Sequence, residues 1–253
     1  MTETLDIFGV RVTDTNLSMA AQTIDGWIQQ RVKTYVCVAP VSTVVQCQED
    51  KDYCQIVNKA GMVTPDGMPI VWTGKLMGKK RIGRTYGPDL MLVLCEQGQM
   101  KGYRHFFYGG TPPANQRLVE KLKQRFPKIN IVGNLAPAAQ AVGEMDSAQT
   151  LEAINNAQAD ILWVGLGSPK QDYWMHNHRD RLNVPVMIGV GAAFDFVAGI
   201  KKQAPVWMRK IGLEWLFRLC CEPGRLWRRY FFGNSKFIYL SMRYWFTRRM
   251  TRK

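Results

Sequence analysis

The segment 63–69 reads VTPDGMP and holds a single carboxylate, Asp66. Pro-Asp-Gly is ordinary turn chemistry, because proline presets φ, aspartate bonds nearby backbone groups and glycine accepts positive φ. The flanking residues, 60–63 and 68–72, are largely apolar, unlike those of a typical surface loop. A carboxylate with apolar neighbours tends toward a raised pKa, which suits a general base. Both interpretations stay open, since a turn is also a way to hold a carboxylate in place.

Three predicted strands run directly into glycine-bearing turns, at 109–113, 165–170 and 189–195. In an open α/β sheet, ligands bind at the carboxyl ends of strands. There, glycine lets backbone N–H groups approach a phosphate, and a helix N-terminus adds partial positive charge. Three such turns together indicate a nucleotide or diphosphate ligand. None completes G-x-G-x-x-G/A, because Lys170 and Phe194 occupy the last position, so a dinucleotide oxidoreductase is disfavoured.

Two pairs of side chains have a spacing seen in metal sites. His176 and His178 do not share one helical face and have no cysteines nearby, which favours solvated or capping histidines. Asp50 and Asp52 match the D-x-D of metal-dependent sugar transferases, but they lie inside a helical pattern, which favours a solvated charge cluster. No serine elbow, Walker loop or zincin motif occurs. We expect neither a metal nor a cofactor.

Strand-like and helix-like segments alternate along the chain. Apolar or β-rich runs predict strands at 34–38, 105–108, 129–132, 161–164 and 186–190. Helical periodicity predicts helices at 19–30, 43–58, 88–96, 113–126, 147–158 and 170–178. Strands that alternate with helices form βαβ units. The predicted fold class is therefore α/β, with a Rossmann-like, mainly parallel sheet flanked by helices.

The length and composition suit a folded α/β protein. A chain of 253 residues with 46% hydrophobic residues can build one large domain, with or without an appendage. Its six cysteines form no C-x-x-C pair, and the polar N-terminus has no signal peptide. These features predict that the protein is located in the reducing cytoplasm.

The positive charge is concentrated at the C-terminal end. Residues 201–253 hold 14 Lys or Arg against two acidic residues, so this segment carries +12 of the net charge of +14. The same segment holds 12 of the 28 aromatic residues. The chain is therefore a nearly neutral body, residues 1–200, followed by a basic and aromatic tail.

The tail has the composition of a segment at a membrane surface. No run approaches the roughly 18 apolar residues that a spanning helix needs. In a helix, Ile238, Met242 and Trp245 recur at i, i+4 and i+7, while Lys236 and Arg243 share another face. Such a helix suits the interface of an anionic membrane. A packing helix with a solvated basic face is the alternative, whereas nucleic acid is disfavoured because no recognition module occurs.

Seven segments together resemble the WecG/TagA/CpsF family of bacterial glycosyltransferases, and they run in family order from about residue 5 to residue 230. The segments are TPDG (64–67), RTYGPDLM (84–91), GLGSPKQ (165–171), GVGAAFD (189–195), AP (204–205), GLEWLFRL (212–219) and EPGR (222–225). The resemblance implies a Rossmann-like catalytic domain in residues 1–200. It also implies that the appendage, residues 201–253, docks on the membrane and completes the site.

The resemblance further implies an inverting, metal-independent transfer of a sugar. The donor would be a UDP-sugar, and the acceptor a sugar linked to undecaprenyl diphosphate, at the cytoplasmic face of the inner membrane. Asp66 would be the catalytic base and Gln171 would contact the substrate. Three tail arginines, Arg218, Arg225 and Arg228, would reach the diphosphate. An enzyme of this kind needs one well-placed base and cationic groups for the leaving UDP.

Other residues in or next to the matching segments are candidate substrate contacts. They are Thr64, Arg84, Asp89, Gly109, Gly110, Gly165, Gly167, Lys170, Gly191 and Asp195. Structural roles compete with substrate contact for three of them: Arg84 and Asp89 can pair at a helix start, and Asp195 can cap a helix.

One segment departs from the family pattern. Family members often carry Asn-x-Glu after the first core strand, where this chain has Pro40-Val41-Ser42. The donor is therefore either an N-acetylmannosamine-type sugar or a plain hexose. A nucleotide-binding membrane module and an NAD-type oxidoreductase are the competing functions. The sequence does not choose between a monomer and a homo-oligomer.

Overall fold

The computed structural model describes residues 3–137 and 147–250, without the side chains of 229 and 245–250. A hairpin of β1 (Thr4–Ile7) and β2 (Val10–Thr13) precedes a sheet of six strands. The strands of this sheet are β3 (Thr34–Ala39), β4 (Met62–Pro65), β5 (Arg104–Gly109), β6 (Asn130–Leu135), β7 (Ile161–Gly165) and β8 (Val186–Gly189). They are all parallel, in the order β4-β3-β8-β7-β5-β6. The predicted α/β class with a parallel sheet is confirmed.

Helices connect the strands and continue beyond the last one. They are α1 (Leu17–Gln29), α2 (Val41–Gln46), α3 (Lys51–Asn58), α4 (Met68–Leu76), α5 (Gly87–Lys101), α6 (Pro112–Arg125), α7 (Ala148–Asn156), α8 (Lys170–His178), α9 (Ala193–Val197), α10 (Val206–Lys210), α11 (Glu214–Cys221) and α12 (Pro223–Met250). Several begin at a side-chain cap or a proline. Asn16 accepts from the Met19 N–H at 3.1 Å to begin α1, and Thr111 caps α6, whose first residues are prolines.

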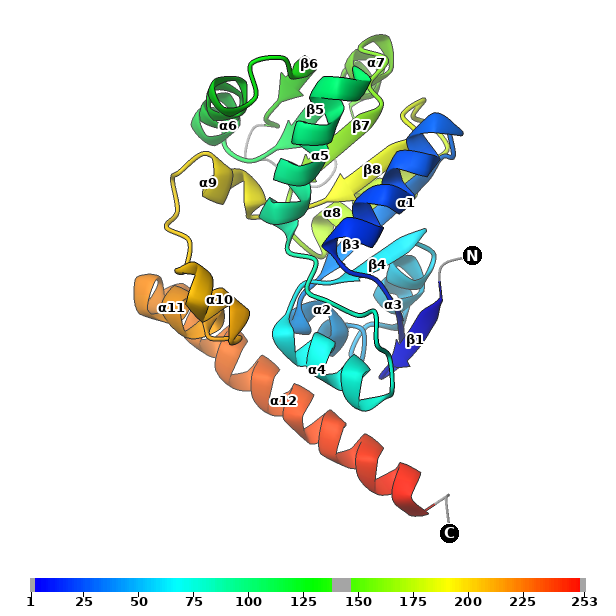
Figure 1. Ribbon diagram of the computed structural model, residues 1–253, viewed down its shortest axis with the longest axis vertical. Coiled ribbons are helices and arrows are strands. Elements are labelled where there is room, and N and C mark those ends of the chain that lie inside the picture. The colour runs from blue at the N-terminus through cyan, green and yellow to red at the C-terminus, as the bar shows by residue number, and fades with distance from the viewer. Residues whose placement is uncertain (1–2, 138–146, 251–253) are drawn as a thin grey trace.

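Helices cover both faces of the sheet (Figure 1). On one face, α1, α5, α6 and α9 pack on strand residues such as Val36, Phe107 and Trp163. On the other face, α7 and α8 pack on residues such as Tyr35 and Leu162. Because strands buried on both sides must be apolar throughout, their sequences read as continuous apolar runs. These runs are the signal that predicted five of the six strands.

Several elements differ from the sequence predictions. The hairpin strands and β4 were not predicted because each has only four residues, and the helices α4 and α9 were not predicted either. Pro65 is tolerated in β4 because β4 lies at the edge of the sheet. The helix predicted at 43–58 is wrong, since α2 and α3 are separate there. Asp50 begins α3 by accepting from the Tyr53 N–H at 2.9 Å, so it caps a helix instead of lying within one.

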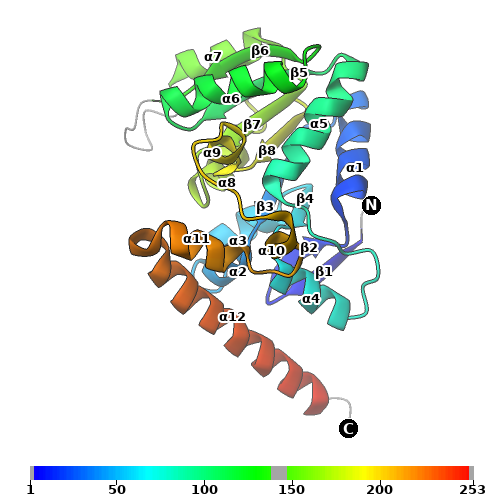
Figure 2. The same cartoon turned by 60° about the vertical axis from the view of Figure 1, so that its left-hand side comes forward.

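The tail forms a helical appendage, α10 to α12, that docks on the body (Figure 2). The last helix, α12, packs against α2 and buries Phe237 in a core cluster with the hairpin and α4. Phe8 meets Phe237 edge to face at 5.4 Å, and Lys236 pairs with Glu49. Part of the tail is therefore a packing helix. Ile238 and Met242 are exposed, as the membrane interpretation expects, whereas the side chain of Trp245 lies outside the described residues.

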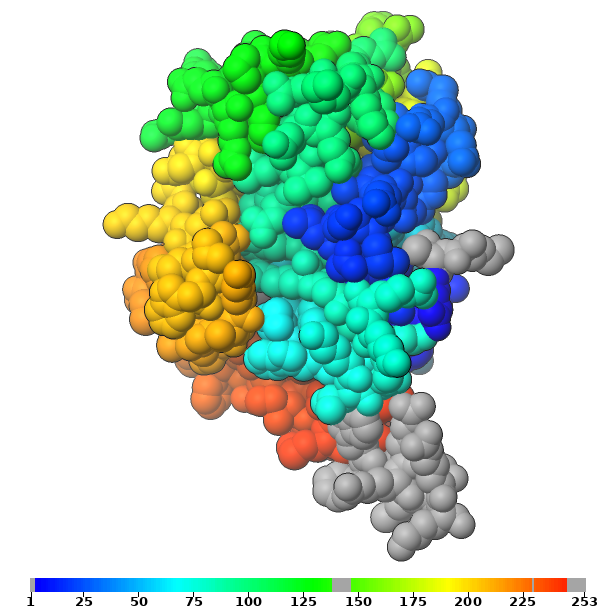
Figure 3. Space-filling view, in the orientation of Figure 1, coloured from blue at the N-terminus to red at the C-terminus, as the bar shows by residue number. Residues whose placement is uncertain are grey.

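The appendage contacts the body again through α4. In the space-filling view, its atoms meet those around α4 (Figure 3). Gly212 is packed so closely that an added Cβ would come within 2.9 Å of the Trp72 ring. Within residues 3–137 and 147–250, no helix combines the length and apolarity that crossing a bilayer requires.

We expect Gly109→Ala to lower the free energy of unfolding by about 2 kcal/mol, because φ is +119° and a Cβ would lie 2.6 Å from the Gly165 backbone. Equilibrium urea unfolding measures the change. Gly26→Ala is the matched control, since a Cβ there meets open space within a helix, and it should leave stability equal or higher. Equal stability of the two variants would contradict the packing role of Gly109.

Candidate active site

A pocket of about 410 Å³ lies at the carboxyl ends of four neighbouring strands, β4, β3, β8 and β7. The loops that follow these strands supply residues 40–42, 66–69, 167–168 and 190–193 to its wall. The appendage closes the opposite side with residues from α11 and α12, among them Glu214, Arg218 and Arg225. Ligands of open α/β sheets bind at this edge. The pocket therefore forms where the body and the appendage meet.

Asp66 is placed in this pocket by the end of β4. Pro65 pairs with Ala39 of β3, and the Asp66 N–H donates to the Ala39 carbonyl at 3.2 Å. The Thr85 N–H donates to the Pro65 carbonyl at 2.8 Å, and α4 begins two residues after Asp66. The turn is therefore held by hydrogen bonds on both sides. Turn chemistry and a fixed carboxylate coexist here.

The surroundings of Asp66 raise its pKa to about 6. Burial is the main cause, the Arg84 guanidinium opposes it, and the Glu214 carboxylate adds to it. Its Oδ1 is enclosed without a hydrogen bond and lies 3.7 Å from Arg84 Nη2, while 20% of the side-chain surface stays exposed. The carboxylate is thus mostly ionised at pH 7 and close to the pH at which proton transfer is most efficient.

Arg84 joins the Asp66 turn to the appendage. Its Nε donates to the Asp66 carbonyl at 2.6 Å, its Nη1 donates to the Arg209 carbonyl at 3.3 Å, and its Nη2 binds the Glu214 carboxylate. The Tyr86 ring lies 4.3 Å from the guanidinium carbon. One side chain therefore connects β4, α10 and α11.

The Arg84–Asp89 pair considered from the sequence is not formed. Asp89 instead pairs with Arg209 of α10 at 3.1 Å, and it lies outside the lining of the pocket. Arg84 pairs with Glu214 because the appendage brings a carboxylate closer. Both ion pairs link the body to the appendage.

Gln171 lies in the pocket wall at the start of α8 and is 2% exposed. Its Oε1 accepts from the Gly167 N–H at 3.2 Å, and its Nε2 donates to Ser168 Oγ at 3.2 Å. The amide therefore holds the shape of the loop between β7 and α8. Lys170, its neighbour, is exposed and lies outside the lining.

The three tail arginines differ in their surroundings. Arg218 lines the pocket with its guanidinium carbon 5.3 Å from the Phe196 ring centre, and within the described part of the chain it forms no ion pair with a carboxylate. Arg225 also lines the pocket but pairs with Glu222. Arg228 lies over Trp227, outside the lining. Arg218 is thus the cation most available to an anionic ligand.

The glycine turns divide into two groups. Gly167 and Gly191 line the pocket. Gly109, Gly110 and Gly165 do not, and Phe194 packs against Gly110 and Gly165, where a Cβ on Gly165 would come within 2.7 Å of the ring.

Thr64 and Asp195 also lie outside the lining. Thr64 is fully buried, and its Oγ1 makes no hydrogen bond. Asp195 pairs with Lys201 at 2.9 Å.

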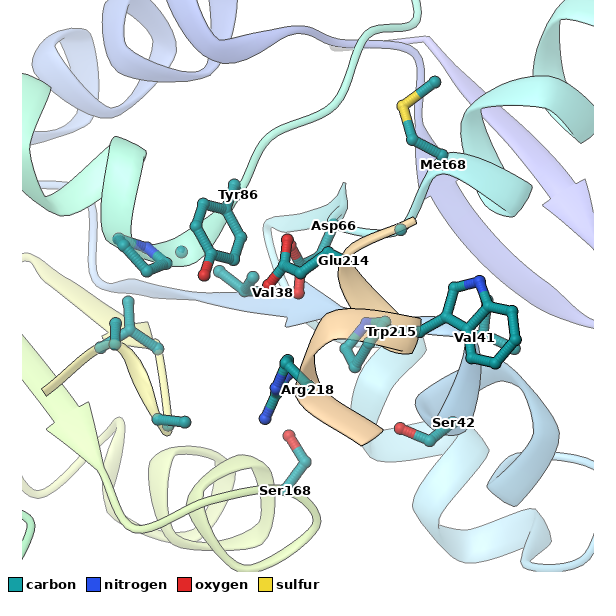
Figure 4. A pocket seen from close by; sticks show the side chains of 18 of the residues that line it. Val38, Val41, Ser42, Asp66, Met68, Tyr86, Ser168, Glu214, Trp215 and Arg218 are labelled. Carbon is teal, nitrogen blue, oxygen red and sulfur yellow. The ribbon is translucent and has the colours of Figure 1, made fainter. Parts of the chain in front are cut away.

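Glu214 and Tyr86 are pocket residues to which the sequence assigned no role. Figure 4 shows the carboxylates of Asp66 and Glu214 near each other, with Tyr86 and Arg218 on the same cavity. Burial, followed by the nearby carboxylates, raises the pKa of Tyr86, so its hydroxyl stays protonated. Glu214 had one signal, because it is one of two acidic residues in a strongly basic tail.

The residues with metal-like spacing have structural roles. Asp50 Oδ2 accepts from the Tyr173 hydroxyl at 3.0 Å in addition to capping α3. His178 is not solvated, because it is buried. Its Nδ1 lies 2.8 Å from the Trp174 carbonyl, so the ring bonds the backbone in the last turns of α8. Among the residues that the structure covers, no three His, Cys, Asp or Glu side chains are grouped to hold a metal ion.

Relatives of this chain are known. It is similar to the N-acetylglucosaminyldiphosphoundecaprenol N-acetyl-beta-D-mannosaminyltransferase of Bacillus spizizenii, with 29% identity over 203 residues, 80% of this chain and 77% of the relative. The enzyme of the same name from Bacillus subtilis has the same identity and coverage. Its namesake from Staphylococcus aureus is 24% identical over 229 residues, 90% of this chain and 88% of the relative.

A family match covers nearly the whole chain. Residues 5–251, which include the body, the pocket and the appendage, match the sequence pattern of one family. A match of this extent decides between the transferase and the oxidoreductase. The chain belongs to the glycosyl transferase WecG/TagA/CpsF family and is a glycosyltransferase.

Proposed function

We propose that this enzyme transfers a sugar from a UDP-sugar to a polyprenyl-diphosphate-linked N-acetylglucosamine, with Asp66 as the general base. The names of the relatives support this acceptor and an N-acetylmannosamine-type donor sugar. A hexose donor is the alternative, because residues 40–42, which depart from the family pattern, line the pocket. The assignment of Asp66 as the base rests on a difference in hydrogen bonding between the two carboxylates of the pocket. Glu214 is bound by Arg84, whereas Asp66 Oδ1 has no hydrogen bond.

The proposed reaction is a single displacement at the anomeric carbon. Asp66 takes the proton of the acceptor hydroxyl while the oxygen of that hydroxyl forms a bond to the anomeric carbon. The bond from the anomeric carbon to the UDP oxygen breaks, and its electron pair leaves with UDP. Attack opposite the leaving group inverts the anomeric configuration. A base with a pKa of about 6 accepts the proton at neutral pH.

The leaving UDP gains negative charge, which cationic and N–H groups of the pocket would stabilise. Arg218 faces the pocket from α11 (Figure 4), and Arg225 of α12 also lines it. Gly167 and Gly191 allow close approach of a phosphate to the backbone, and the N-terminal end of α8 adds partial positive charge. Guanidinium groups are well suited to diphosphates, because they donate two parallel hydrogen bonds.

We assign residues 1–200 to catalysis and residues 201–253 to an appendage that associates with the membrane and completes the site. The appendage exposes Trp207 and Phe232, both about 60% accessible, on a strongly basic segment. Aromatic side chains and cations together favour the headgroup region of an anionic bilayer. A lipid-linked acceptor would be met there, so we place the protein peripherally at the cytoplasmic face of the inner membrane.

Asp66→Asn should reduce kcat by a factor of about 10² to 10⁴, the range of general-base contributions, because the amide cannot take the proton. The assay follows sugar transfer from UDP-N-acetylmannosamine to a lipid-linked N-acetylglucosamine diphosphate. UDP affinity and the melting temperature of the variant serve as controls for folding. Turnover close to that of the wild type would refute Asp66 as the base.

The double variant Trp207→Ser/Phe232→Ser should bind anionic liposomes about tenfold more weakly, because two exposed aromatic rings no longer enter the interface. Sedimentation with phosphatidylglycerol vesicles measures the binding. Met100→Ser, a change at an 87% exposed residue of α5 on the body, is the control. The membrane role of the appendage would fail if the double variant and the control sedimented alike.

A further inference from the structure

A second cavity, a groove of about 960 Å³, opens between α4 and the appendage. Its wall is formed by α4 on one side and by α11 and α12 on the other. Its apolar lining includes six side chains that are also exposed to solvent, namely Trp72, Leu76, Trp227, Phe231, Ile238 and Met242. Among the side chains that the structure describes, none of those lining the groove belongs to Asp, Glu, Lys or Arg. The groove is thus an apolar cavity in a strongly basic part of the molecule.

The groove is continuous with the active-site pocket. Five residues line both cavities, namely Val41, Pro69, Trp215, Tyr230 and Asn234. The charged side chains of the pocket, such as Asp66 and Arg218, lie on one side of this boundary, and the uncharged groove lies on the other. A ligand that fills both cavities must have a polar, anionic head and an apolar tail.

The groove is also open enough for a chain to enter. Leu76 is 67% exposed and Ile238 is 57% exposed, on opposite walls. Large apolar side chains exposed together in a concave surface indicate a ligand or a membrane contact. Because the groove leads into the catalytic pocket, its occupant must be attached to a substrate that reacts there. A bilayer lipid without such an attachment gains no contact from the connection between the groove and the pocket.

We propose that the groove binds the isoprenoid units of the acceptor that adjoin its diphosphate. The inference rests on the proposed function, since it assigns a subsite to the same acceptor. The diphosphate lies at the boundary between the cavities, beside Tyr230 and Asn234, which line both. The sugar extends toward Asp66, and the hydrocarbon runs between α4 and α12. Burial of the hydrocarbon stabilises the complex roughly in proportion to the apolar area removed from water. The enzyme therefore binds the lipid as well as the sugar of its acceptor.

The test uses the full chain and two soluble acceptors, the farnesyl and the methyl ester of N-acetylglucosamine diphosphate. No vesicles or detergent are present, and the farnesyl ester is kept below its micelle concentration. Wild-type KM should be on the order of a hundredfold lower for the farnesyl ester. Ile238→Gln on α12 and Leu76→Gln on α4 should each reduce this ratio about tenfold, which is about 1.4 kcal/mol.

Tyr239→Gln is the matched control, because Tyr239 is 58% exposed on the same helix as Ile238 and does not line the groove. Its KM ratio should equal that of the wild type. Equal KM values of the wild type for the two esters, or equal ratios in the Ile238 and Tyr239 variants, would overturn the groove assignment. A wild type that uses neither ester would refute the proposed function, and the subsite with it.

Discussion

The site depends on an ionised carboxylate held in an enclosed place by one arginine. Burial and the charge of Glu214 destabilise the ionised form of Asp66, and the charge of Arg84 stabilises it. Arg84 is itself held by the Asp66 carbonyl, the Arg209 carbonyl and Glu214. Removing any one of these groups changes the balance that keeps the pKa of Asp66 near 6. The proposed base and the docking of the appendage therefore depend on the same set of contacts around Arg84.

This coupling gives the appendage two roles. Its ion pairs, Glu214 with Arg84 and Arg209 with Asp89, close the pocket over the strand ends. Its outer surface carries the exposed aromatic residues and most of the net charge. An appendage displaced from the body would remove Glu214 and Arg218 from the pocket together. The proposed membrane contact and the electrostatics of the proposed base are thus connected through the position of α11.

The sequence was sufficient for the fold class and for the turn that holds Asp66. Apolar runs identify strands buried on both faces, and Pro-Asp-Gly identifies a turn. The edge strand β4 was missed because its four residues end in a proline, and the break between α2 and α3 was missed because helical periodicity continues across the Asp50 cap. Such features depend on single hydrogen bonds, to which periodicity is insensitive.

The rest of the site could not be predicted, because it depends on contacts between distant residues. Glu214 acquires its role by meeting Arg84, 130 positions earlier in the chain. Gly109 and Gly165 have the same local pattern as Gly167 and Gly191, but the Phe194 ring occupies the space beside Gly165. The groove unites α4 with α12, and no local pattern relates these helices.

The pH dependence of kcat/KM reports the protonation of Asp66 during turnover. Both proposed substrates are diphosphate diesters without a group that titrates near neutrality, so the acid limb reports on the enzyme. We predict that kcat/KM falls about tenfold per pH unit below about pH 6, as Asp66 becomes protonated, and levels off above it. Glu214→Gln should move this limb to lower pH, because it removes a charge that raises the pKa of Asp66. A limb near pH 4 in the wild type, or a limb unmoved by Glu214→Gln, would contradict the account.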